Sequence, residues 1–138
     1  MMRILLIGTI LLGWSGVGLS AERTSAPSEA RAYIIAPANG EVVGESFVVK
    51  FGLHGMGVAP AGVNKPNTGH FHLIVDGSLP DLNHPMGKQV RHFGGGQTET
   101  RLKLKPGTHT LQLIMGDARH IPHRPAVISE PVRITVEE

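Results

Sequence analysis

The feature that most constrains this chain is the close spacing of its turn residues. Glycine occurs 18 times and proline 10 times in 138 residues, and no segment keeps a helical period over ten residues. Between the turns lie short stretches in which apolar and polar side chains alternate, a pattern typical of half-buried β-strands. Strands are expected over residues 32–36, 46–53, 69–76, 90–93, 98–104, 108–115 and 127–136. The chain is therefore predicted to be all-β.

About seven short strands separated by turns predict an antiparallel β-sandwich of immunoglobulin-like type. A small open barrel is the alternative architecture. Pro131 cannot donate a backbone hydrogen bond, which predicts that the last strand lies at an edge or contains a bulge. The length is that of a single domain, which we expect to extend over residues 31–138.

Residues 1–21 have the pattern of a secretory signal peptide. Arg3 precedes an apolar run, and small residues near Ala21 suit cleavage. The run is short and glycine-rich for a transmembrane helix, so an uncleaved membrane anchor is the less favoured alternative. We expect a flexible leader over residues 22–30 after the cleavage site. These features predict a periplasmic or secreted protein with no membrane contact after cleavage.

The charge balance and the absence of cysteine exclude several classes of protein. Without Arg3, 12 of the 13 basic residues remain against 11 acidic ones, which leaves no electrostatic footprint for nucleic acid. With no cysteine there is no disulfide, no zinc–thiolate cluster and no cysteine nucleophile. No serine stands in a Gly-x-Ser-x-Gly turn. These residues favour a protein that is not an enzyme over a small metal-dependent enzyme.

The strand at residues 69–76 carries the strongest functional signal. His70 and His72 share one face of it, whereas Phe71 and Leu73 point to the other. Two residues along a strand span about 6.5 Å, so two imidazoles at this spacing can converge on one ion. Neutral imidazole suits copper, zinc, nickel and iron. The pattern predicts a metal site.

Three further histidines in or beside loops are the other predicted ligands, namely His92, His120 and His123. Three histidines would leave an open coordination position, and four would close it. Copper is favoured, zinc comes next, and no organic cofactor is expected. Met56 and Met86 are loop thioethers that would favour Cu(I), although packing over the edge of the core is the preferred interpretation of both.

The remaining histidines have less specific surroundings. His109 has the parity of apolar neighbours just after a turn, which predicts a structural hydrogen bond to that turn. His54 and His84 are expected to be solvated. Asp117 is the best candidate for a carboxylate that orients a ligand ring, although an ordinary Gly-Asp turn is the preferred interpretation.

Four segments together resemble a known family. They are Gly-His-Phe-His-Leu-Ile-Val-Asp at 69–76, His-Phe-Gly-Gly-Gly-Gln-Thr-Glu-Thr at 92–100, Pro-Gly-Thr-His-Thr-Leu-Gln-Leu at 106–113, and Gly-Asp with His120 and Pro-His within 116–123. In this order they resemble the domain of unknown function 4399 family of secreted bacterial proteins, over about residues 42–136. Members often have a third histidine where Phe71 stands, which leaves the pair on the opposite face intact. The resemblance implies the fold and the compartment, and the family has no established activity.

Two functions are therefore carried forward. The first is a periplasmic metal-binding module that holds an ion or hands it on, with the ion and another periplasmic protein as partners. The second is a structural or protein-interaction immunoglobulin-like domain in which the histidines are incidental. The distance between the loop histidines and the pair at His70 and His72 distinguishes them, because metal ligands must lie within about 5 Å of one another.

Overall fold

The computed structural model describes residues 22–138, and the predicted signal peptide lies outside this range. Within it no helix is long and apolar enough to cross a membrane. The described chain forms nine β-strands: β1 (Arg31–Ala36), β2 (Val42–Gly44), β3 (Ser46–His54), β4 (Gly57–Val58), β5 (Thr68–Val75), β6 (Arg91–His92), β7 (Glu99–Lys103), β8 (Gly107–Gly116) and β9 (Val132–Glu137).

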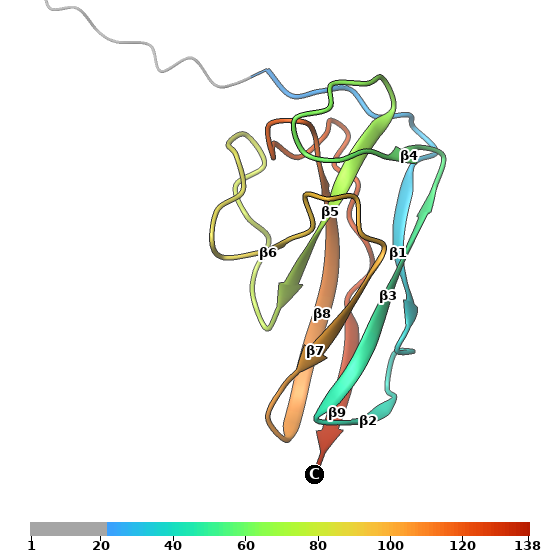
Figure 1. The fold of residues 1–138 in the computed structure, drawn as a ribbon, viewed down its shortest axis with the longest axis vertical. Coiled ribbons are helices and arrows are strands. Elements are labelled where there is room, and N and C mark those ends of the chain that lie inside the picture. The colour runs from blue at the N-terminus through green and yellow to red at the C-terminus, as the bar shows by residue number, and fades with distance from the viewer. Residues whose placement is uncertain (1–21) are drawn as a thin grey trace, which may run out of the picture.

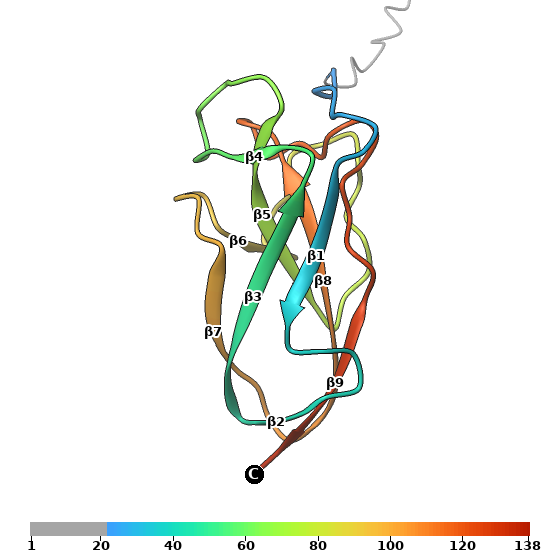
Figure 2. The ribbon, with the colours of Figure 1, turned by 90° about the vertical axis from the view of Figure 1, so that its right-hand side faces the viewer.

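The strands form two sheets that pack face to face. One sheet has the order β1-β3-β7, and the other has the order β2-β9-β8-β5-β4, with β6 paired to β5. The strands run along the long axis of the molecule (Figure 1), and a quarter turn shows β1 and β3 in front of β5 and β8 (Figure 2). The predicted immunoglobulin-like β-sandwich is confirmed.

Two short strands, β2 and β4, were not predicted, and the last strand begins later than expected. Strands β2 and β4 have three and two residues and pair in parallel with β9 and β5, so they are too short to show alternation. The last strand begins at Val132, directly after Pro131, and lies between β2 and β8 rather than at an edge. Residues before the proline contact β8 through an isolated bridge between Ile114 and Ile128 and through hydrogen bonds of Val127 and Ser129, without forming a continuous strand.

The main core lies between the two sheets and fixes the orientation of β5. Phe71 and Leu73 of β5 are 1% and 0% exposed and belong to this core. The ring of Phe51 in β3 lies 5.1 Å from that of Phe71 and 4.9 Å from that of Phe93. Burying these side chains holds one face of β5 against β3. The alternate residues of β5 must then point away from the main core.

A second, smaller apolar cluster covers part of the outer face of the same sheet. Ile74 of β5 and Ile114 of β8 pack there against Met86 and Val90 of the loop that follows β5. The outer face of β5 is thus covered by chain instead of facing water, as Figure 1 shows for the loop between β5 and β6. This covering decides the environment of His70 and His72.

Residues 22–30, predicted to be a flexible leader, make specific contacts along the loop after β8. The guanidinium of Arg23 donates hydrogen bonds to the carbonyl groups of Pro122 and His123. Ala26 is 7% exposed, and its N–H donates to the carbonyl of Arg124 at 3.0 Å. The part of the segment from Arg23 to Ala26 is therefore packed as part of the domain, next to the loop that carries His120.

Candidate metal centre

Strand β5 positions the first two histidines. His70 and His72 lie on the face opposite Phe71, and they are 0% and 1% exposed. The face of β5 that carries them does not face water, because the loops that follow β5 and β8 close over it. The imidazole ring centroids of the two residues lie 4.6 Å apart.

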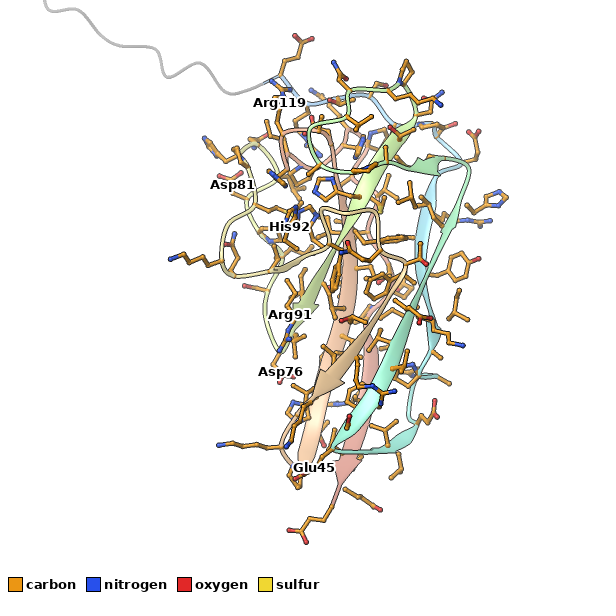
Figure 3. All side chains as sticks on the ribbon, viewed as in Figure 1. Glu45, Asp76, Asp81, Arg91, His92 and Arg119 are labelled. Carbon is orange, nitrogen blue, oxygen red and sulfur yellow. The ribbon has the colours of Figure 1, made fainter. Side chains whose placement is uncertain are left out.

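Strand pairing brings the third histidine across from the second. In the antiparallel pair of β5 and β6, His92 is the direct partner of His72. Side chains of directly opposed residues have Cβ atoms about 4.5–5.5 Å apart on the same face. The next residue, Phe93, is buried in the main core, so His92 has to point to the other face. Figure 3 shows His92 on the flank of the sandwich between the levels of Arg119 and Arg91.

The fourth histidine comes from the loop that begins where β8 ends. Gly116, the last residue of β8, is the strand partner of His70, so the chain leaves the sheet beside the site. His120 has a φ of 65°, in the left-handed region where histidine occurs more often than most residues. Its N–H donates to the carbonyl of Asp117 at 2.9 Å, and its carbonyl accepts from the N–H of Met86 at 2.9 Å.

Asp117 builds the loop instead of orienting a ring. Its Oδ1 accepts hydrogen bonds from the N–H groups of Arg119 and Ile121, and its Oδ2 accepts from the hydroxyl of Thr24 at 2.6 Å. Burial raises the pKa of this carboxyl, but the hydrogen bonds from Thr24 and the two N–H groups outweigh burial and hold the pKa below its usual value. The Gly-Asp turn was thus the better interpretation, and the turn presents His120.

The four rings meet at one point. One possible ligand atom from each of His70, His72, His92 and His120 can be chosen so that all four lie within 4.8 Å of one another. Nε2 of His70 is 3.0 Å from Nδ1 of His120 and 3.1 Å from Nε2 of His92. Four nitrogens about 2.0–2.1 Å from a tetrahedral zinc ion stand about 3.3 Å apart, so small ring rotations suffice to surround an ion.

Several ring nitrogens of the cluster lack the hydrogen bonds that buried polar groups normally make. A neutral ring nitrogen has either one hydrogen or one lone pair, so Nε2 of His70 cannot form a full hydrogen bond to both of its neighbours. Both ring nitrogens of His72, and Nδ1 of His70, are buried with no hydrogen-bond partner among residues 22–138. A buried polar group left without a partner costs about 1–3 kcal/mol. An ion in the cluster would bond one nitrogen of each ring, and so would give one nitrogen of His72 a partner.

The surroundings of His70, His72 and His92 favour the neutral ring, which is the form that binds metal. Burial, then the neighbouring His120 and His92, lower the pKa of His70 to about 4. Burial, then His70, His92 and His120, lower the pKa of His72 to about 3. Burial and the neighbouring His120 also lower the pKa of His92. The cluster therefore presents lone pairs at neutral pH, and a metal does not first have to displace protons from the buried pair.

The other histidines lie outside this group of four. His123, a predicted ligand, is fully buried, and its Nε2–H donates to the carbonyl of Thr68 at 3.0 Å, so it supports the start of β5. His109 is structural, as predicted, with Nδ1 at 2.6 Å from Asp76 and Nε2 at 2.8 Å from the carbonyl of Lys105. His54 and His84 are exposed, as predicted.

Two glycines that the sequence did not single out make room for the rings. A Cβ on Gly116 would stand 2.6 Å from Cε1 of His72 and 2.9 Å from the methyl carbon of Met86. A Cβ on Gly94 would overlap the ring of His92. Real side chains do not come this close, so both positions exclude larger residues. In the sequence, the only sign of this role is that both glycines stand beside the histidine motifs. A glycine at such a position is equally well explained by a turn.

The cluster opens to solvent on the side of His92 and His120. A pocket of about 310 Å³ is lined by Met86, Gly87, Lys88, Val90, His92 and His120. His92 is exposed and His120 half-buried, whereas His70 and His72 lie beneath them. A larger cavity of about 540 Å³ lies beside β1. His54 is the one histidine in its lining, so this cavity has no group of ligands that could hold an ion.

Fold and site together define a β-sandwich domain with a four-histidine cluster buried on the outer face of one sheet. Residues 49–137 match the model of the family described as domain of unknown function (DUF4399), which is more than half of the chain. The chain belongs to this family. No curated protein matches it. A solved structure of Clostridium thermocellum CbhA fibronectin(III)-like modules is similar, with a TM-score of 0.36 and 13% identity over 77% of this chain and 93% of that one.

Proposed function

We propose that this domain binds one transition-metal ion through His70, His72, His92 and His120, with copper favoured and zinc next. The observation that carries the proposal is the buried His72, whose two ring nitrogens have no partner in the described part of the chain although three other imidazoles lie around it. For a given set of nitrogen ligands, Cu(II) binds more tightly than Zn(II). The four donors are imidazoles, with no thiolate and no carboxylate among them. Such a site suits copper or zinc better than magnesium or calcium, which prefer oxygen ligands.

The arrangement favours holding an ion or handing it on over transforming a substrate. Four protein ligands close a tetrahedral coordination shell, whereas catalytic zinc sites keep one position for water or substrate. Two ligands are buried and two lie at the mouth of the pocket, so an ion can be exchanged from the side of His92 and His120. The partner class that follows is another metal-binding protein in the same compartment.

We further propose that the domain works outside the cytoplasm, in the periplasm or as a secreted protein. The support is the signal-peptide pattern of residues 1–21. The absence of cysteine agrees with this. A site built from histidine has no thiol that could be oxidised to a disulfide in that environment. Intact-mass measurement of the exported protein tests the proposal, and a mass that includes Met1 would contradict it.

Calorimetric titration of the metal-free protein with Cu(II) and with Zn(II) tests the binding site. The variant His92→Ala with His120→Asn removes the two outer ligands without opening the core, and asparagine tolerates the positive φ of position 120. We expect one ion per chain in the wild type and a loss of affinity of at least about 100-fold in this double variant. The matched control, His54→Ala with His84→Ala, removes two exposed rings and should bind like the wild type.

Two results would refute the metal site. One is the absence of saturable binding to the wild-type protein. The other is equal loss of affinity in the double variant and its control, which would mean that binding is spread over surface histidines. Either result would leave the protein-interaction domain as the better explanation of this fold.

A further inference from the structure

Met86 lies directly beside the histidine cluster and is tied to it. The residue is 9% exposed and lines the pocket together with His92 and His120. Its N–H donates to the carbonyl of His120 at 2.9 Å, so the backbone of Met86 is fixed relative to one of the proposed ligands. The loop after β5 therefore delivers a thioether side chain to the mouth of the site.

The side chain of Met86 also meets the inner end of the cluster. The point at which a Cβ of Gly116 would stand is 2.9 Å from the methyl carbon of Met86 and 2.6 Å from Cε1 of His72. The methyl end of the thioether and the edge of the His72 ring thus lie side by side over this glycine. The lack of a side chain at Gly116 is what lets both occupy the space.

We propose that Met86 is a thioether ligand of Cu(I) at the same site, in place of one of the four imidazoles, so that the domain binds Cu(I) as well as Cu(II) and discriminates against zinc in the reduced state. This inference rests on the proposed function. Thioether sulfur is a soft donor and binds Cu(I), whereas Zn(II) at such sites is held by imidazole, thiolate or carboxylate. Met is unbranched, with three rotatable bonds, so its sulfur can move toward an ion without displacing the backbone.

Packing alone does not account for the choice of residue. Met86 packs against Ile74, Val90 and Ile114, which leucine would satisfy at nearly the same volume. Met56, the second loop methionine, packs instead against the edge of the main core. It is not among the residues that line the pocket beside the cluster. The chain therefore contains a matched pair, one methionine at the site and one away from it.

The test compares Met86→Leu with Met56→Leu in the full-length secreted protein. Cu(I) affinity is measured without oxygen by competition with a chromophoric Cu(I) chelator, and Zn(II) affinity is measured by calorimetry. We expect Met86→Leu to weaken Cu(I) binding by at least about tenfold and to change Zn(II) binding by less than about twofold. Met56→Leu should change neither. X-ray absorption of the Cu(I)-loaded wild type should show a sulfur neighbour that is lost only in Met86→Leu.

Far-ultraviolet circular dichroism confirms that both variants are folded, so a loss of binding is not mistaken for unfolding. Equal Cu(I) affinity in the two variants, or a Cu(I) spectrum of the wild type without sulfur, would overturn the role of Met86. If in that case Cu(II) and Zn(II) still bind and still depend on His92 and His120, the proposed histidine site stands. If the wild type binds none of the three ions, both proposals fall.

Discussion

The metal-free protein should lose stability as the pH falls from 7.5 to 5, because His70 and His72 are held neutral in the fold. Their folded-state pKa values are about 4 and about 3, below the value of 6.5 for an unperturbed histidine. The unfolded chain therefore binds more protons than the folded one over this range, and the free energy of unfolding decreases. The stabilisation is fully present above about pH 6.5 and is lost as the pH falls toward the folded-state values.

The size of the effect follows from the same values. At pH 5 an unfolded histidine is almost fully protonated, whereas His72 and His70 stay mostly neutral in the fold. Each then reduces the free energy of unfolding by about 2 kcal/mol between pH 7.5 and 5. Because the two rings share neighbours, their contributions are not independent, and we expect about 2–4 kcal/mol in total. This change in the free energy of unfolding depends little on the two folded-state pKa values as long as both stay well below 5.

His92, whose pKa is lowered by burial and by the neighbouring His120, acts in the same direction as the buried pair. His109 acts in the opposite direction, and Asp76 and Asp117 contribute little in this window. Hydrogen bonds to Asp76 and to the carbonyl of Lys105 raise the pKa of His109. Its stabilisation is therefore present below about pH 6.5 and is lost as the pH rises through the folded-state value. The lowered pKa values of Asp76 and Asp117 matter only below about pH 4, since both are ionised above it.

Urea unfolding of the metal-free protein at pH 7.5 and 5.0, with a chelator present, measures the effect. The variant His72→Leu should retain about half of the pH dependence of the wild type, because one of the two buried rings remains. The control His54→Ala removes an exposed ring and should retain all of it. Equal stability of the wild type at both pH values, or an unchanged pH dependence in His72→Leu, would refute the argument that burial keeps these rings neutral.

Three further predictions concern packing around the site. Phe71→Ala and Leu113→Ala remove side chains that are 1% and 0% exposed, and each should lower the free energy of unfolding by about 2–5 kcal/mol in chemical denaturation. Gly116→Ala should weaken copper binding at least about tenfold in calorimetry, because its Cβ would overlap His72, while Gly44→Ala, with no atom within 4 Å, should not. Asp117→Ala leaves two N–H groups and a hydroxyl without their acceptor, and it should cost about 1–3 kcal/mol of stability and weaken metal binding as well.

The sequence by itself determined the fold class and the pairing of the first two ligands. Alternation over residues 69–76 places His70 and His72 on one face, because successive side chains of a strand point to opposite sides. The same rule, with the turn residues between strands, predicted the sandwich and its inward-facing residues such as Phe71. Strands β2 and β4 and the true start of β9 were missed, because two or three residues are too few to show alternation.

Only the tertiary structure decided which loop histidines reach that pair. His92 reaches the site because it pairs with His72 across two strands. His120 reaches it because Asp117 holds a turn at the end of β8. His123 is only three residues further along the chain, yet its ring bonds to Thr68. These outcomes depend on contacts between residues about 20 to 55 positions apart, which local periodicity does not encode. Burial was decided in the same way, because the outer face of β5 becomes an interior only when the loops after β5 and β8 close over it.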